Sequence, residues 1–200
     1  METFTYPHFD HHQSVVHVAL FLDVSNAKDL RTRIVNASTL TEDAGDVERE
    51  TVNFAFIDAR LITSRLHLQT AIYQALLSQS QGILRTKTVH SEIIWALNPS
   101  NNITEALRRH GVSDGSTSLF VVRVASPELQ DVQSKMLAVV DGAISPLSKL
   151  ASLTDWSSIR KYYKLNSESA VKEIRSDANQ EHAVVDKIVV SSVAMKSVMQ

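Results

Sequence analysis

The sequence predicts an α/β (α+β) fold: a single domain with a mainly antiparallel, mixed sheet covered by about seven or eight helices. The chain has 200 residues, of which 44% are hydrophobic and 21% are charged, so it can bury one substantial core. Strand-like apolar runs alternate with segments of helical periodicity, and no repeat or linker divides them. We therefore expect one domain over residues 14–200, preceded by a flexible lead-in over residues 1–13.

A strand and a capped helix open the domain. Residues 15–22 (VVHVALFL) are mostly β-branched, aromatic or aliphatic, which predicts a buried strand. Asn26 then caps a helix whose inward face carries Leu30, Ile34 and Val35. The next segment, 39–50, is acidic and has almost no apolar residues. It lacks the alternating ligands of a calcium loop, so we expect a solvated surface loop.

A second strand and helix follow. Residues 52–58 (VNFAFID) alternate in the manner of a strand, and the Thr-Ser pair at 63–64 can cap the next helix. Apolar residues between 68 and 76 repeat at helical spacing and form its inner stripe, and Gly82 ends it. His67 lies beside this stripe, so we expect it at the flank or the surface.

The central stretch contains two short helices. The first, 91–97, ends before a proline, since the residue preceding proline disfavours helical dihedral angles. The second, 103–110, follows Asn102, which forms a capping-box pattern with Glu105. We expect the glycine after it to be left-handed. Its predicted buried stripe consists of Ile103, Ala106, Leu107 and His110.

The last third begins with the most strand-like run in the chain, 117–124 (TSLFVVRV), which we expect at the centre of the sheet. The Ser-Pro pair at 126–127 begins a helix with an apolar face, and Thr154 can cap another that carries Trp156. From residue 167 a helical pattern leads to an apolar C-terminal tail. Because its apolar content exceeds what the adjacent core requires, we expect part of it to be an exposed patch for a partner protein.

Composition excludes several classes of protein. The chain has no cysteine, so neither a disulfide framework nor a thiolate metal site is possible. A formal net charge of -2 restricts any RNA contact to a local basic patch. No apolar run is long enough to span a bilayer, and the N-terminus lacks the residue order of a signal peptide. We therefore expect a protein of the nucleus and cytoplasm that is not attached to a membrane.

Catalytic motifs are missing from the sequence. It has no nucleophile elbow, phosphate-binding loop, dinucleotide fingerprint or zinc-protease motif. His8, His11 and His12 could together hold a metal ion, but a polar N-terminal segment is the commoner explanation. We therefore expect no cofactor, no metal and no enzymatic activity, with a small hydrolase that lacks a recognisable motif as the alternative.

One block of the sequence is similar to a known family. Residues 85–113, RTKTVHSEIIWALNPSNNITEALRRHGVS, contain a basic Thr-containing run, a Glu-Ile-Ile helix, a polar turn, and a helix with Glu-Ala-Leu that ends in glycine. This order resembles the signature block of the small regulatory subunit of the KEOPS (EKC) complex, known in animals as the PRPK-binding protein. The resemblance extends more weakly to 15–35, 118–124 and 184–198. Residues 39–50 and 147–181 depart from the family pattern.

The resemblance implies a non-catalytic subunit that binds the PRPK-type kinase/ATPase of KEOPS, supports its activity, and contacts the rest of the complex indirectly. It further implies a role in making threonylcarbamoyl-adenosine in tRNA, with the subunit holding the 3′ CCA tail. Telomere and transcription roles attributed to the complex are left open by the sequence. A stand-alone RNA-binding protein is the alternative.

Candidate contact residues follow from this resemblance together with residue chemistry, because phosphates need cations and a protein interface needs an apolar centre. For tRNA we expect contacts from Arg85, Lys87, His90, Arg108 and Arg109. For the kinase we expect contacts from Val184, Val185 and Ile188. Structural roles compete with both assignments, since the apolar residues could be core and the two arginines after Leu107 could only neutralise the end of their helix.

Overall fold

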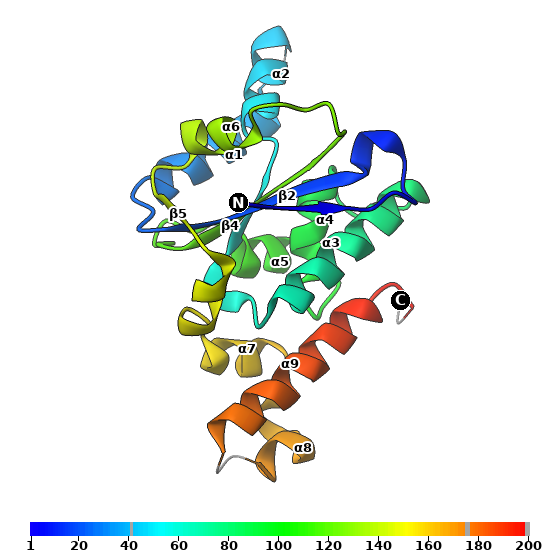
Figure 1. The fold of residues 1–200 in the computed structure, drawn as a ribbon, viewed down its shortest axis with the longest axis vertical. Coiled ribbons are helices and arrows are strands. Elements are labelled where there is room, and N and C mark those ends of the chain that lie inside the picture. The colour runs from blue at the N-terminus through cyan, green and yellow to red at the C-terminus, as the bar shows by residue number, and fades with distance from the viewer. Residues whose placement is uncertain (41, 175–176, 199–200) are drawn as a thin grey trace.

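The computed structural model describes residues 1–40, 42–174 and 177–198. Within these ranges, an antiparallel sheet has helices on both faces and a helical lobe beside it (Figure 1). The strands are β1 (Glu2–Thr5), β2 (Val15–Leu22), β3 (Ala55–Asp58), β4 (Leu119–Ala125) and β5 (Ala143–Ser145). The α-helices are α1 (Ala27–Thr39), α2 (Glu42–Thr51), α3 (Arg65–Ser80), α4 (Val89–Ala96), α5 (Ile103–His110), α6 (Val132–Val139), α7 (Trp156–Tyr162), α8 (Ser169–Lys172) and α9 (Ala178–Ala194). Short 3-10 helices are η1 (His11–Gln13), η2 (Ala59–Leu61), η3 (Leu147–Ser152) and η4 (Leu165–Ser167).

The sheet confirms the predicted α+β fold. Its strand order is β1-β2-β4-β3, and β5 pairs with β2 beyond the end of β1. All of these pairings are antiparallel. Every residue of β4 is buried, so the strand predicted at 117–124 does lie inside the sheet. No helix in the described ranges is long and apolar enough to cross a membrane.

The two faces of the sheet carry separate hydrophobic clusters, because successive strand residues point to opposite sides. Leu20 and Val122 belong to the cluster that packs against α3 and α4. Phe21 and Val121 belong to the cluster that packs against α1 and α6. The apolar stripe predicted for α3 between residues 68 and 76 is buried in the first cluster.

A third cluster forms the helical lobe, which consists of α7, η4, α8 and α9. Ile159 of α7, Val171 of α8 and Val189 of α9 are each at most 1% exposed and pack together. From the lobe, α9 continues to the side of α3 (Figure 1), where the Gln74 amide donates to the Ala194 carbonyl at 2.9 Å. The helical pattern predicted from residue 167 thus becomes α8 and α9, and residues 175–176 between them lie outside the described ranges.

The N-terminal segment belongs to the sheet, where the sequence predicted a flexible lead-in over 1–13. Strand β1 pairs with the first half of β2, with Thr3 opposite His17. Tyr6 and Phe9 pack against the first hydrophobic cluster. Four residues are too few to show strand periodicity, so the pairing partner, and not the local pattern, makes this segment a strand.

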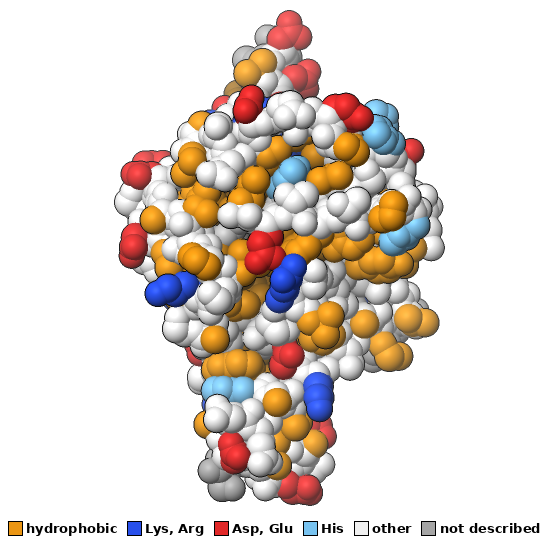
Figure 2. Space-filling model, in the orientation of Figure 1, with side chains coloured by type: hydrophobic (Ala, Val, Ile, Leu, Met, Phe, Trp, Pro, Cys, Tyr) orange, Lys and Arg blue, Asp and Glu red, His pale blue; other side chains and the backbone are white. Residues whose placement is uncertain are grey.

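The acidic segment predicted as a loop forms helix α2, apart from residue 41, which lies outside the described ranges. Arg33 of α1 pairs with Glu48 at 2.8 Å, and Arg49 donates to the Leu40 carbonyl at 2.8 Å. These contacts with α1 stabilise a helix whose own sequence has no apolar stripe. Figure 2 shows acidic side chains on the tip of α2, which projects from the body of the molecule.

Helix α5 has the predicted boundaries, but its burial and its end differ from the prediction. Ala106 and His110 are buried, whereas Ile103 and Leu107 are 37% and 40% exposed. Gly111 is not left-handed, since its φ is -77°. A glycine is required there for another reason: a Cβ would lie 2.5 Å from the Leu107 carbonyl oxygen.

Candidate functional site

The N-terminal end of α4 is held by two hydrogen-bonding devices. Thr88 and Ser91 form a reciprocal capping box, in which each side-chain oxygen accepts from the other residue's backbone N–H at 3.1 and 3.2 Å. Glu92, only 1% exposed, accepts from the backbone N–H groups of Arg85 at 3.0 Å and Thr86 at 2.8 Å. The Thr86 hydroxyl donates to the same carboxylate at 2.7 Å. The loop that carries the predicted basic residues is therefore fixed by a buried anion.

Beside this loop lies a cavity of about 470 Å³, which we call the basic cavity. Its charged or imidazole-bearing lining residues include Lys87, His90 and Arg123. Polar side chains from other parts of the fold complete the lining, namely His12, Gln13, Asn53 and Gln79. The start of α4 also borders it, so the positive end of the helix dipole adds to the positive potential.

His90 lines the basic cavity as a neutral ring. Its Nε2 accepts the backbone N–H of Val124 at 3.0 Å, because β3 begins at Ala55, opposite Val122, and leaves that part of β4 without a strand partner. The proton is therefore on Nδ1, which has no partner among the described residues. Burial, assisted by the charge of Arg123, lowers the pKa of His90 to about 3, so the ring is neutral at pH 7.

Arg123 is a cavity residue that the sequence reading did not identify. Its guanidinium donates to the Asn53 carbonyl at 2.6 Å and to the Glu50 carboxylate at 2.5 Å, and lies 5.6 Å from the centre of the Phe54 ring. Its Nε has no partner in the part of the chain that the structure describes. The available signal was a single arginine inside an otherwise apolar strand.

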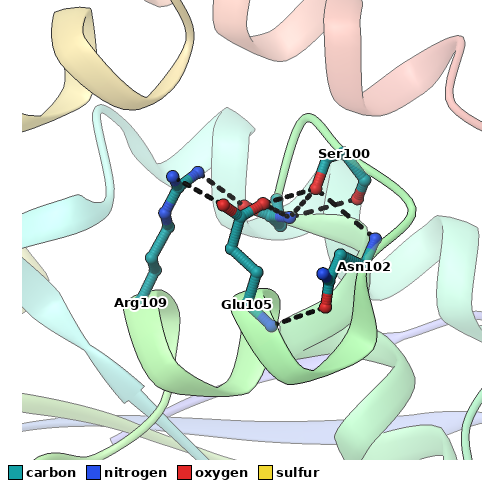
Figure 3. Close-up of polar contacts among 5 residues, drawn as sticks. Ser100, Asn102, Glu105 and Arg109 are labelled. Carbon is teal, nitrogen blue, oxygen red and sulfur yellow. Dashed lines mark hydrogen bonds and ion pairs between the residues drawn. The ribbon is translucent and has the colours of Figure 1, made fainter.

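Arg109 is engaged in a structural network at the start of α5 (Figure 3). It pairs with Glu105 at 2.7 Å, and its guanidinium lies 4.6 Å over the Tyr162 ring of α7. Glu105 also accepts from Ser100 at 2.5 Å and from Asn98 at 3.3 Å, and these hydrogen bonds lower its pKa. This network holds the turn between α4 and α5 and leaves Arg109 little freedom to bind a ligand.

The predicted RNA-binding residues fall into two groups. Arg85, Lys87 and His90 lie at the N-terminal end of α4, while Arg109 reaches Asn98 beyond its other end. A helix of this length separates the two groups by about 12 Å. Arg108, next to Arg109, is exposed. The structure thus brings Lys87 and His90 together with Arg123 in the lining of the basic cavity, which does not include Arg85.

Asn102 caps α5 by accepting the Glu105 backbone N–H at 2.9 Å (Figure 3). We expect Asn102→Ala to lower the free energy of unfolding by about 1 kcal/mol, which corresponds to a melting temperature lower by about 2–4 °C. The matched control is Asn101→Ala at the neighbouring exposed position. A thermal melt in which both variants lose the same amount would contradict a capping role for Asn102.

The residues predicted to contact a kinase lie on α9, in the helical lobe. Val185 is 0% exposed and belongs to the lobe's hydrophobic cluster, so its side chain cannot be part of a surface. Val184 and Ile188 are half-buried and pack against the same cluster. Nearby, the rings of Trp156 and His182 stack with centroids 4.0 Å apart. The apolar surface of α9 is therefore smaller than the sequence predicted.

Lys196, just beyond α9, was also missed. It is 7% exposed, and its Nζ donates to the carbonyls of Trp95, of Asn98 at 2.6 Å and of Ser100 at 3.2 Å. The ammonium also lies 3.7 Å from the centre of the Trp95 ring. Burial lowers the pKa of Lys196 to about 7, and the Glu92 carboxylate acts in the opposite direction. A single lysine in an apolar tail gave no sequence signal for this role.

The N-terminal histidines do not converge. The ring of His11 lies 2.6 Å from the Glu128 carboxylate, and His8 stacks in an aromatic group with Phe9 and Tyr73. Among the described residues, no group of three or more His, Cys, Asp or Glu side chains is arranged to hold a metal ion.

Comparisons with known proteins agree with the resemblance of residues 85–113. The family model for the kinase binding protein CGI-121 matches residues 21–197. A protein from Cryptococcus neoformans, named EKC/KEOPS complex subunit CGI121, is 34% identical over 96% of this chain and 100% of its own length. A relative with the same name from Neurospora crassa is 33% identical over 94% of this chain and 93% of its own length. Another from Gibberella zeae is 35% identical over 99% of this chain and 99% of its own length. This chain therefore belongs to the CGI-121 family of kinase-binding proteins.

Proposed function

We propose that this protein is a non-catalytic subunit of the EKC/KEOPS complex in the nucleus and cytoplasm. In this role it binds and regulates the PRPK-type kinase/ATPase subunit and supports threonylcarbamoyl-adenosine modification of tRNA. The family match over residues 21–197 and the names of relatives that align along their whole length support this assignment. Titrating the protein into a purified PRPK-type kinase, while following ATP hydrolysis, tests it. One-to-one binding with altered hydrolysis is expected, and absence of binding at micromolar concentrations would overturn it.

The proposal includes holding the 3′ end of tRNA in the basic cavity. The observation that carries it is the convergence of Lys87, His90, Arg123 and the start of α4 on the lining of one cavity of about 470 Å³. Cations, N–H donors and a helix N-terminus all favour phosphate oxygens. Amide side chains in the same lining, such as Gln79, can donate to and accept from base edges.

We expect Lys87→Glu to weaken binding of an RNA that ends in a single-stranded CCA tail by about tenfold, because it replaces a cation that faces phosphate by an anion. The dependence of affinity on salt should become less steep by about one unit of log–log slope. Arg85 is less suitable for this test, since it is not among the residues that line the basic cavity. Fluorescence titrations at several salt concentrations give both quantities.

The control for this test is Lys28→Glu, which makes the same charge change at an exposed residue of α1 that does not line the basic cavity. Equal weakening by both variants would indicate only a net-charge effect. Unchanged binding by Lys87→Glu with a large loss for Arg108→Glu would move the RNA contact from the basic cavity to α5.

A further inference from the structure

Helix α4 links the basic cavity to the helical lobe. Its first turn borders the cavity through Val89 and His90, and Lys87 lies just before it. At its other end, Lys196 donates to the Trp95 carbonyl in the last turn and to the Asn98 carbonyl just beyond it. The hydroxyl of Tyr163, from the end of α7, donates to the Leu97 carbonyl. The helix is thus completed by side chains that belong to the C-terminal part of the chain.

These contacts have no ready replacement. The last carbonyls of a helix have no partner within it, and a cation is the favourable group at that end of the helix dipole. Because Lys196 is 7% exposed and Tyr163 is 8% exposed, water cannot easily take over the role of either side chain. Removing the ammonium would take away the donor to the Asn98 carbonyl, whereas the Trp95 carbonyl would keep the Asn98 N–H at 3.1 Å and the Ser100 carbonyl the Asn98 side-chain amide at 3.1 Å. This end of α4 would therefore lose one anchor and loosen.

The loop at the cavity end of α4 also depends on the Glu92 carboxylate of the same helix. Glu92 fixes the backbone of residues 85 and 86, and its negative charge acts on Lys196. Lys196 is joined to α9, which carries the half-buried Val184 and Ile188. Helix α4 therefore carries both contacts, because Glu92 bonds the cavity loop and the turn that follows the helix bonds Lys196.

We propose that Lys196 is a positioning residue that couples partner binding on the helical lobe to ligand binding in the basic cavity. This inference rests on the proposed function, with the kinase on α9 and the RNA tail in the cavity. A partner that binds α9 restricts the motion of Lys196 and therefore of α4, so the RNA tail binds to a cavity whose α4 side is already held in place. By linkage, the RNA tail strengthens kinase binding by the same factor.

The test is a cycle of four RNA affinities. A short single-stranded RNA ending in CCA is titrated into the protein alone and into the protein saturated with purified PRPK-type kinase, for the wild type and for Lys196→Met. We expect the kinase to raise RNA affinity about tenfold in the wild type and less than twofold in the variant. Titration of the RNA into the kinase alone corrects for direct binding.

The matched control is Gln74→Ala, which removes a different hydrogen bond that anchors α9, the one from Gln74 of α3 to the Ala194 carbonyl at the end of α9. A purely structural role of Lys196 predicts that both variants lose stability and that neither changes the affinity ratio. If Lys196→Met does not fold, Tyr163→Phe replaces it, since this change removes only the hydroxyl that donates to Leu97 and should lower the ratio.

Each outcome decides a different statement. An affinity ratio in Lys196→Met equal to that of the wild type overturns the coupling role. A wild-type ratio of one also overturns it, while leaving both binding functions in place. A wild-type protein that binds neither the kinase nor the RNA overturns the proposed function itself.

Discussion

Val185→Asp is expected to unfold the helical lobe, while Ile188→Asp leaves it folded and abolishes kinase binding. Val185 is 0% exposed within the lobe's cluster, so the new carboxylate would have neither water nor a cation beside it, at a cost of several kcal/mol. Ile188 is half-buried, so a carboxylate there can reach water. In the complex, the same carboxylate would lie unpaired against an apolar partner surface.

Circular dichroism melts and calorimetric titration with the purified kinase measure these two effects separately. Val184→Asp is the second half-buried position and should behave like Ile188→Asp. Similar losses of melting temperature for Ile188→Asp and Val185→Asp would place both residues in the core. Full kinase affinity in a folded Ile188→Asp variant would exclude this part of α9 from the interface.

Acid is expected to unfold the protein well above pH 3, because three histidines are buried in neutral form. Burial lowers the pKa of His67, His90 and His110 from 6.5 to about 3. Between these two pH values the unfolded chain binds protons that the folded protein cannot, so stability is complete above about pH 6.5 and falls as the pH decreases. Three such groups contribute a slope of about 4 kcal/mol per pH unit in the middle of this range.

His110 provides the sharpest test of this pH dependence. Neither of its ring nitrogens has a partner among the described residues, so His110→Leu removes the titration without breaking a known hydrogen bond. We expect the variant to be more stable than the wild type at pH 5. When melting temperatures are recorded between pH 7 and pH 4, their dependence on pH should be about one third less steep in the variant. His12→Gln, at an exposed ring, is the control. An unchanged slope in His110→Leu would mean that His110 does not resist protonation.

Several elements could be predicted because their signals are local. Strand β2 and helix α5 have the predicted boundaries, 15–22 and 103–110. The β-branched residues of β2 favour a strand, and the asparagine cap favours the start of α5. Both effects depend only on residues a few positions away in the sequence. The basic loop with Lys87 was predicted in the same way, from the composition of a short segment and its resemblance to a family.

Other elements were decided by residues far away in the sequence. Strand β1 exists because β2 offers it an edge, and α2 because it packs on α1. The prediction of His67 as a flank or surface residue was wrong: its ring is 0% exposed and accepts the Thr63 backbone N–H at 3.2 Å. Periodicity reports which side of a helix is apolar, but it does not report that a polar ring finds a buried donor.

The sequence by itself determined the fold class, the family and the loop that carries Lys87. Only the tertiary structure decided what this loop faces. It places Arg123 of β4 in the same cavity lining as Lys87. It also lets His90 accept the Val124 backbone N–H, which has no strand partner, and brings Lys196 to the end of α4. The physical reason is that caps and periodicities act within one or two helical turns, whereas a cavity is made by side chains that the sheet and the C-terminal helix bring together across the whole chain.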